Sequence, residues 1–300
     1  MINISFHPSY HHGLPENHKF PMLKYSELVR KIKSEKIFSE ENFFSPRPLD
    51  ENLLLLTHTE EYVNKVKNIK LERKEERRMG FPQSKQLYER ELIITNGTLR
   101  GAELAIYNGL SFNIAGGTHH GFSYKGEGFC IFNDIAVAAN TMLYNGIARK
   151  VLVIDLDVHQ GNGTAEIFDK EPRVFTYSVH GKNNYPLKKE ISDRDTELDD
   201  LTGDKEYLNI ISEEIPYLLD SEKPDFVFYQ SGVDVLESDK FGRLSLTIDG
   251  TRKRDEIVYS ECKKRGLPVS CTMGGGYSKD LNLILEAHLN TYIIGKKYYY

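Results

Sequence analysis

The sequence lacks the features that mark secreted, membrane-spanning and nucleic-acid-binding proteins. It has only three cysteines, at positions 130, 262 and 271 and without CxxC spacing, which indicates reduced thiols in a cytoplasmic compartment. No stretch approaches the roughly 18 consecutive apolar residues of a membrane-spanning helix, and the first residues do not have the layout of a signal peptide. The formal net charge of −5 gives no support for direct binding to nucleic acid.

Internal repeats and low-complexity linkers are also missing, so nothing in the 300 residues marks a domain boundary. Hydrophobic residues make up 39% of the chain, which is enough for a sizeable core. A single α/β domain of this length is common, and we therefore predict one domain over residues 1–300. The mixed charges of residues 70–78 predict a solvated helix or loop.

Four histidines lie among prolines and aromatic residues near the start of the chain, at positions 7, 11, 12 and 18. Their spacing matches no standard zinc module, and neighbouring X-Pro pairs favour extended backbone. We therefore expect this segment to form a surface loop or to line the mouth of a site, and not to bind a second metal ion.

Strands and helices alternate through most of the chain. Short apolar runs predict strands at residues 111–115, 151–157, 173–179, 225–230 and 268–273. Helical periodicity and capping residues predict helices at residues 25–33, 60–67, 99–107 (capped by Thr95–Thr98), 135–144 (capped by Asp134), after Gly163 (capped by Thr164), 204–219, 250–264 and 280–289. Residues 51–56 fit either a short strand or the start of a helix. The alternation is typical of an α/β fold, a single domain in which a central, mostly parallel sheet carries helices on both faces.

The segment 151–164 gives the strongest indication of a functional site. Residues 151–154 form a short apolar, β-branched run, which is typical of a strand buried on both faces of a parallel sheet. Asp155, Asp157 and His159 follow at alternate positions, so on an extended backbone their side chains share one face. Charged groups are costly there unless they are paired or bind a cation. Taken alone, this pattern fits a strand with an acidic exit loop equally well.

Polar residues also follow other predicted strands. His119 and His120 come after residues 111–115, Asp234 comes after residues 225–230, and Tyr277 ends a glycine run after residues 268–273. In a parallel sheet these loops leave at the same edge, so their side chains can share one cleft.

Together these residues suit a metal-dependent hydrolase. Asp157, His159 and Asp234 offer one nitrogen and two carboxylate ligands, and three protein ligands with an open fourth position are typical of catalytic zinc. A metal there would activate water and polarise a carbonyl. The two adjacent histidines would transfer protons, and the tyrosine would donate a hydrogen bond to a developing oxyanion.

Six short motifs resemble those of the zinc-dependent histone deacetylases, a family of lysine deacylases with the arginase–deacetylase fold. They follow the order found in that family, from about residue 110 to about residue 280: Gly116–Gly121, Gly128–Cys130 with Asn133-Asp134, Asp155–His159, Ser178–His180, Ser231–Asp234 and Gly274–Tyr277. Further segments resemble the class IV branch and its bacterial relatives, namely Leu14-Pro15, His18, Phe20–Met22 and His159–Gly163.

The resemblance implies two kinds of bound ion. Asp157, His159 and Asp234 would hold the catalytic ion, which would be Zn²⁺ or, alternatively, Fe²⁺. A structural K⁺ ion would be held by Asp155, Ser178 and the backbone carbonyls of Asp157, His159 and Val179.

The resemblance also implies the catalytic roles. His120 would act as general base and then as general acid, with electrostatic help from His119, which Asp155 would orient. Tyr277 would polarise the acyl carbonyl together with the metal. The substrate-binding residues would be Gly128, Phe129, Tyr185 and Gly275, and the two aromatic residues among them would flank a narrow tunnel for the acyl-lysine side chain.

One position departs from the better-known class I pattern. Asn162 stands where those enzymes usually have an Asp that pairs with the second catalytic histidine. A neutral partner stabilises an imidazolium ion less than a carboxylate does, so we predict a lower pKa for His120 than an Asp would give. Asn162 is therefore a further candidate catalytic-site residue.

The predicted reaction is hydrolysis of an acyl-lysine amide in a protein or peptide. An acetylpolyamine amidohydrolase, which acts on an acylated small amine, fits the same residues. An arginase-like binuclear manganese hydrolase would need more acidic ligands, and an inactive acyl-lysine-binding module would not need the complete set of ligands, histidines and tyrosine. The acyl chain, the target and the oligomeric state stay open at this point.

Overall fold

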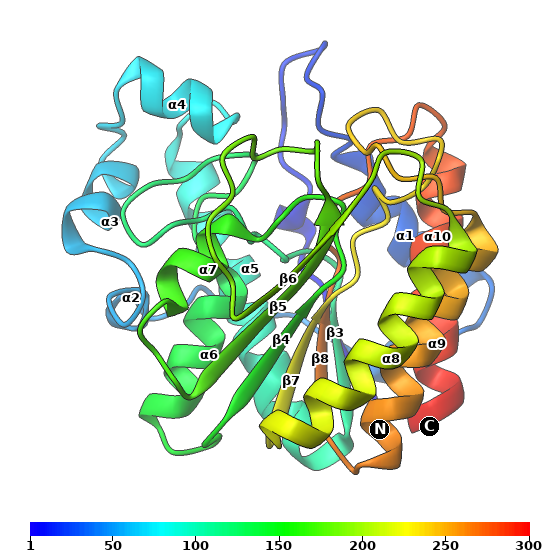
Figure 1. Ribbon diagram of the computed structural model, residues 1–300. Helices are drawn as coiled ribbons and strands as arrows, with labels where there is room; N and C mark the ends of the chain where they lie inside the picture. The colour runs from blue at the N-terminus through cyan, green and yellow to red at the C-terminus, as the bar shows by residue number, and fades with distance from the viewer.

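An eight-stranded β-sheet runs through the centre of the computed structural model, which describes residues 1–300 (Figure 1). The strands are β1 (Asn3–Ser5), β2 (Phe43–Phe44), β3 (Leu110–Asn113), β4 (Val151–Asp155), β5 (Val174–Gly181), β6 (Arg194–Leu198), β7 (Phe226–Gln230) and β8 (Val269–Thr272). Their order is β2-β1-β3-β8-β7-β4-β5-β6, and every neighbouring pair is parallel. The predicted sheet was mostly parallel; the observed one is parallel throughout.

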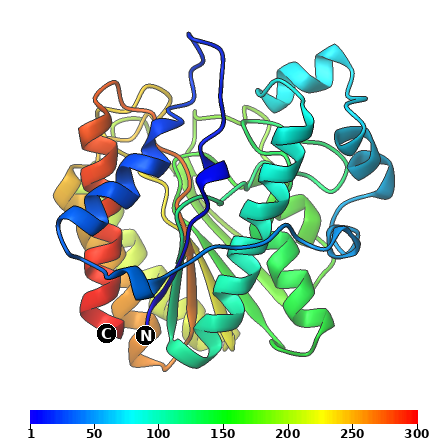
Figure 2. The same cartoon turned by 180° about the vertical axis from the view of Figure 1, so that it is seen from behind.

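Helices cover both faces of the sheet (Figures 1 and 2). On one face lie α1 (Leu23–Ser34), α8 (Asp204–Glu222), α9 (Ile248–Lys264) and α10 (Leu281–Tyr299), and on the other α5 (Lys85–Asn108), α6 (Asp134–Tyr144) and α7 (Asn162–Phe168). The short helices α2 (Glu51–Leu54), α3 (Glu60–Lys67) and α4 (Arg73–Met79) pack outside the second layer. No helix combines the length and apolar character needed to cross a membrane.

The middle strands of the sheet form the centre of the core. Every residue of β4, β7 and β8 is buried, as expected for parallel strands covered by helices on both sides. Because all strands point the same way, the loops that follow them gather at one edge, while both chain termini lie near the opposite edge (Figure 2). This edge with the strand ends positions the candidate site. The three cysteines are free and buried.

Helix α5 is much longer than predicted. The predicted cap at Thr95–Thr98 is wrong, because the helix begins at Lys85 with Ser84 as its N-cap. Thr95 lies inside the helix, where its hydroxyl donates to the carbonyl of Glu91 at 2.7 Å. The Thr-Asn-Gly sequence, which has low helix propensity, is tolerated because Gly97 lets the helix approach the sheet closely: a Cβ there would collide with the side chains of Ser5 and Tyr10.

Two other predicted caps are also corrected. Helix α7 begins at Asn162, not after Gly163, and Gly161 is its N-cap. The hydroxyl of Thr164 instead accepts a hydrogen bond from Asn133 at 3.0 Å. Asn133 is the N-cap of α6, where it accepts from the backbone of Ala136 at 3.0 Å, and Asp134 is the first helical residue.

Three strands lie outside the predicted set. Strands β1 and β2 have three and two residues, too few to show a periodic pattern. Strand β6 lies at the edge of the sheet and reads Arg-Asp-Thr-Glu-Leu, with only its last residue buried. Residues 51–56 contain a short helix, and residues 73–78 of the charged segment 70–78 belong to α4.

Candidate metal centre and catalytic cleft

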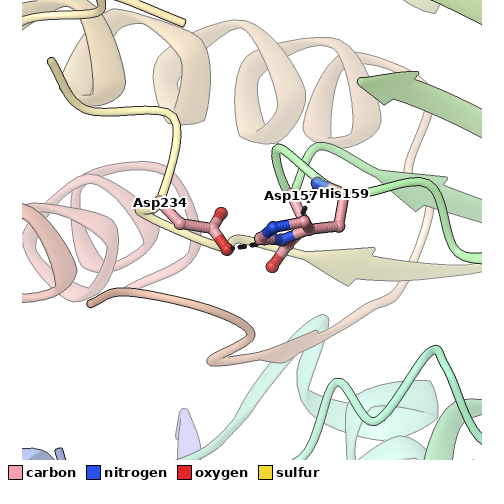
Figure 3. A group of neighbouring side chains, drawn as sticks. All are labelled: Asp157, His159 and Asp234. Atoms are coloured by element: carbon pink, nitrogen blue, oxygen red, sulfur yellow. Dashed lines mark hydrogen bonds and ion pairs between the residues drawn. The ribbon is translucent and has the colours of Figure 1, made fainter. Parts of the chain in front are cut away.

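Three potential metal ligands meet at the carboxyl edge of the sheet (Figure 3). Asp157 and His159 lie in the loop after β4, and Asp234 lies in the loop after the neighbouring strand β7. Their ligand atoms all lie within 4.8 Å of one another, and all three side chains are buried. The parallel arrangement of β4 and β7 is what brings these distant positions together.

Backbone N–H groups orient the two aspartates, and the aspartates orient His159. Nδ1 of His159 lies 3.1 Å from one carboxylate oxygen of Asp157 and 3.1 Å from one of Asp234. The second oxygen of Asp234 accepts from the N–H of Val158 at 3.0 Å, and that of Asp157 accepts from the N–H of Gly275 at 2.8 Å. A Cβ at position 275 would collide with the carboxylate of Asp234, so a glycine is required beside the ligands.

The donor set fits a divalent cation. Burial, reinforced by the negative charge of Asp157, raises the pKa of Asp234 to about 7. Burial disfavours a charged His159, but hydrogen bonds to the two carboxylates outweigh it and raise the pKa to about 10. A proton on Nδ1 is thus stabilised between two carboxylates, which is where a positive ion would bind. One imidazole and two carboxylates, with further positions open, match the ligand preference of catalytic zinc.

The predicted histidine pair lies beside these ligands. Nδ1 of His119 hydrogen-bonds to Asp155 at 2.6 Å, and its Nε2 lies 3.8 Å from a carboxylate oxygen of Asp157. Burial lowers the pKa of His119, but the charges of the two aspartates outweigh burial and raise it. The rings of His119 and His120 lie 4.1 Å apart, centroid to centroid.

His120 has a neutral partner and a low pKa. Its Nδ1 lies 2.6 Å from Oδ1 of Asn162. Burial and the charges of His119 and His159 hold the pKa of His120 well below the ordinary value, and the hydrogen bond to Asn162 offsets this only in part. The far end of the Asn162 amide donates to Oε1 of Glu127 at 3.0 Å.

Tyr277 closes the cleft from the side of β8. Its backbone N–H donates to Asp239 at 2.6 Å, and its ring packs against Phe20, Phe129 and Phe241 at centroid distances of 6.0, 6.0 and 5.1 Å. Burial raises its pKa well above the ordinary value, so its hydroxyl remains a hydrogen-bond donor. Tyr277 lines the same cavity as His120, Asp157 and His159.

Of the predicted tunnel residues, Gly128, Phe129 and Gly275 line the cavity, whereas Tyr185 is not among its lining residues. Phe129 lines the cavity with Phe20 and Phe81 and has a left-handed backbone, φ +68°, a conformation that is strained for a bulky residue. Gly128 before it also has a positive φ, and a Cβ there would lie 2.6 Å from the ring of His120. Tyr185 is 39% exposed, and its ring meets that of His120 edge-on at 5.1 Å.

The residues predicted to hold potassium lie behind the metal ligands. The register of β4 and β5 places Asp155 opposite Ser178, and Val179 follows in the same strand. The carbonyl oxygens of Asp157 and His159 accept no backbone hydrogen bond, although both residues are buried. Such carbonyl oxygens are the kind of ligand that K⁺ takes.

Four residues of the site were not predicted from the sequence. Phe81 and Arg90 line the cavity, Glu127 contacts Asn162, and Lys24 is completely buried against the loop of Tyr277. Only the burial of Lys24 could have been predicted from the sequence, because it lies four residues before Leu28 and so shares the buried face of α1. The roles of Phe81, Arg90 and Glu127 depend on contacts with distant parts of the chain, which the sequence does not display.

The N-terminal histidines lie apart from the group of Asp157, His159 and Asp234. His7 caps a short 3₁₀ helix, Pro8–Tyr10. His18 stacks on Phe81 and lies 2.8 Å from the carbonyl oxygen of Gly80. His18 thus packs on a residue that lines the cavity, and Phe20 of the same segment lines it directly, which agrees with a segment at the mouth of a site.

Comparison with known proteins gives a consistent result. A family model described as "Histone deacetylase domain" matches residues 18–292. An uncharacterized protein of Picosynechococcus sp. is 40% identical over 285 residues, which is 95% of each chain. Histone deacetylase 2 of Arabidopsis thaliana is 29% identical over 277 residues, covering 89% of this chain and 71% of that protein. The crystal structure of an HDAC homolog from Aquifex aeolicus has a TM-score of 0.84 at 23% identity, over 98% of this chain and 84% of that one.

Proposed function

Because the chain belongs to the histone deacetylase family, we propose that it is a divalent-metal-dependent hydrolase that removes acyl groups from lysine side chains. The observation that carries this proposal is the group of Asp157, His159 and Asp234 beside a histidine pair and a buried tyrosine. The sequence motifs typical of the class IV branch lead us to place it there, and its free cysteines lead us to place it in the cytoplasm.

Asp157, His159 and Asp234 would hold the catalytic ion, for which we propose Zn²⁺, with Fe²⁺ as the alternative. When bound, the ion would supply Lewis-acid activation of the amide carbonyl and of the attacking water. We also propose a structural K⁺ ion, held by Asp155, Ser178 and the carbonyls of Asp157, His159 and Val179.

His120 is the proposed proton carrier. Its Nδ1 is engaged by Asn162, so Nε2 faces the cavity and would take a proton from the attacking water and return it to the leaving amine. His119, held by Asp155, would stabilise negative charge that develops in the cleft.

Tyr277 and the aromatic residues act on the substrate. The hydroxyl of Tyr277 would donate a hydrogen bond to the oxygen of the tetrahedral species. Phe129 and Tyr185 would flank the four methylene groups of the lysine and exclude water from them, with Gly128 and Gly275 leaving room for the amide. Burial of the apolar lysine stem would supply binding energy.

The test is a panel of acyl-lysine peptides that differ only in chain length, assayed with Zn²⁺ alongside an acylated polyamine. We expect release of the acyl group from at least one peptide. Turnover of the polyamine alone would replace the lysine proposal with a small-amine one. Two tightly bound transition-metal ions per chain would instead indicate an arginase-like binuclear enzyme, and no turnover of any amide would overturn the proposed function.

The His120→Ala variant tests the role of His120 separately. We expect turnover of the best peptide to fall by at least 100-fold, since general acid–base catalysis contributes roughly that much. Zinc content, measured by elemental analysis, should stay near that of the wild type because His120 is not among the three ligands. Near-normal turnover would contradict the assigned role.

A further inference from the structure

The wall of the cleft contains a carboxylate that the proposed reaction does not use. Glu127 is buried, with 8% of its surface exposed. Its Oε1 accepts a hydrogen bond from Nδ2 of Asn162 at 3.0 Å, and Nζ of Lys125 lies 3.5 Å from the same oxygen. Burying a carboxylate is costly, so these contacts call for an explanation.

The contact with Glu127 decides which way the Asn162 amide points. An amide has an accepting and a donating end of nearly the same shape, and rotation by 180° exchanges them. Here Oδ1 faces Nδ1 of His120 at 2.6 Å and also accepts from the N–H of Gly163 at 3.1 Å, while Nδ2 faces Glu127. A carboxylate only accepts hydrogen bonds, so Glu127 excludes the reversed amide.

The direction of this amide in turn sets the tautomer of His120. Because Oδ1 can only accept, Nδ1 of His120 must carry the hydrogen, which leaves the lone pair on Nε2. A reversed amide would present N–H to Nδ1 and move the hydrogen to Nε2. In that tautomer His120 has no lone pair at Nε2 with which to take a proton from water.

We propose that Glu127 is a positioning residue, which fixes the amide of Asn162 and thereby keeps His120 in the tautomer that can act as a base. This inference rests on the proposed role of His120. An aspartate at position 162 would accept through either oxygen and would need no such help. The asparagine needs a third residue, and Glu127 is the acceptor that contacts its other end.

A double-mutant cycle with Glu127→Ala and Asn162→Asp tests the proposal. In the wild-type background, Glu127→Ala should lower kcat for an acyl-lysine peptide by about 10- to 100-fold, the loss expected for one charge-assisted hydrogen bond. A larger loss is not expected, because the N–H of Gly163 still donates to Oδ1 and so favours the correct orientation of the Asn162 amide. In the Asn162→Asp background the same change should not lower kcat by more than about threefold, since an aspartate has no donating end and its carboxylate is repelled by that of Glu127. Equal losses in both backgrounds would indicate independent effects and overturn the proposal.

The tautomer itself can be measured without turnover. In ¹⁵N-histidine NMR spectra of the zinc-loaded protein, the wild type should show the hydrogen of His120 on Nδ1, and Glu127→Ala should show an increased share on Nε2. Glu127→Gln, which keeps the shape and one accepting oxygen, should fall between the two and guards against misfolding of the alanine variant. An unchanged His120 spectrum in both variants would overturn the proposal.

A control variant tests whether any carboxylate near Asn162 would have the same effect. Glu166→Gln neutralises a carboxylate on the helix of Asn162 that binds Ser123 and has no contact with the amide, and it should leave the His120 spectrum unchanged. A changed His120 spectrum in this variant would contradict the proposed path. If the wild type hydrolyses no amide, the proposed function fails, while the NMR result still decides the role of Glu127.

Discussion

The side chains around His120 lower its pKa. Burial and the neighbouring His119 and His159 disfavour the imidazolium form, and Asn162 offers no negative charge to offset them. A base with a low pKa stays unprotonated at lower pH. The protein is therefore expected to keep its activity further into the acidic range than a relative with an aspartate at this position.

Asn162→Asp tests this expectation. A carboxylate 2.6 Å from Nδ1 would raise the pKa of His120 by roughly one unit or more. Activity is lost as pH falls through this pKa, so the acidic limb of kcat/KM against pH should move to higher pH by a similar amount. An acidic limb that stays in place would show that Asn162 does not set the pKa of the base.

A second unusual residue is the buried Lys24. Its Nζ donates to the carbonyl of Gly274 at 3.1 Å and lies 5.1 to 5.7 Å from the ring centroids of Phe20, Tyr25 and Tyr277. It has no carboxylate partner, and burial lowers its pKa to about 8. The aromatic faces and the carbonyl thus stabilise a cation that supports the loop of Tyr277.

Lys24→Met should remove one part of the pH dependence of stability. The folded state releases the Lys24 proton near pH 8, whereas the unfolded state keeps it to about 10.5. Between these values the unfolded state binds more protons, so this group should raise the free energy of unfolding by roughly 1.4 kcal/mol per pH unit. Urea denaturation from pH 7 to 10 should show that rise in the wild type and not in the variant. Parallel curves would contradict the lowered pKa.

Among single residues, the sequence predicted those side chains whose position follows from strand ends. His120, Asp157, Asp234 and Tyr277 each come shortly after a buried apolar run, and parallel strands place such residues at one edge. Glu127 and Lys24 could not be found this way, because their importance depends on what lies across the fold from them. Neither Asn162 nor Gly274 is near its partner in sequence.

Among the elements, α5 shows how tertiary contacts override local propensity. Residues 95–98 look like the start of a helix, yet they lie in the middle of one because Gly97 packs directly on the side chains of Ser5 and Tyr10. The cost of a glycine within a helix is about 1 kcal/mol. The close approach of α5 to the sheet outweighs that cost.

Gly97→Ala should therefore destabilise the protein although alanine favours helices. Overpacking of this kind costs roughly 1–3 kcal/mol, and urea denaturation would measure it as a lower midpoint. Gly13→Ala is the matched control, because nothing lies within 4 Å of a Cβ there and its backbone needs no positive φ. Equal midpoints for the two variants would refute the close approach.

The missed strands have a common physical cause. Strand β6 is polar and forms an edge, so its sequence carries no burial pattern, and β1 and β2 are too short to show one. In contrast, β4, β7 and β8 are buried on both faces and were predicted from apolar runs alone. A strand can therefore be predicted from the sequence when its residues are buried, whereas a polar or very short strand cannot.

For the molecule as a whole, the predicted α/β fold is confirmed, and the structure adds its strand order. That order depends on contacts between residues far apart in the chain, which a single sequence does not display. It places β4 next to β7, so the three proposed metal ligands are held by loops that follow two central strands of the sheet. Folding stability should thus depend on the metal.

Chelation of the metal should lower the melting temperature by roughly 5–10 °C, because an ion that binds only the folded state stabilises it by several kcal/mol. Added Zn²⁺ should restore the original value. Asp234→Asn, which removes one ligand, should make the melting temperature insensitive to the chelator. Scanning fluorimetry of both proteins would measure this, and an equal drop in each would contradict a metal at this position.

The order of strands also governs how the chain can assemble as it leaves the ribosome. Strands β3 and β4 are successive in sequence, but β8 and β7 separate them in the sheet. At a synthesis rate of about 5–20 residues per second, roughly 8–30 seconds pass between the synthesis of β3 and that of its partner β8. During that time the groups β2-β1-β3 and β4-β5-β6 each have an unpaired edge. Such edges pair readily with a wrong strand. The central pairings of the sheet can therefore form only after the last strand has been synthesised.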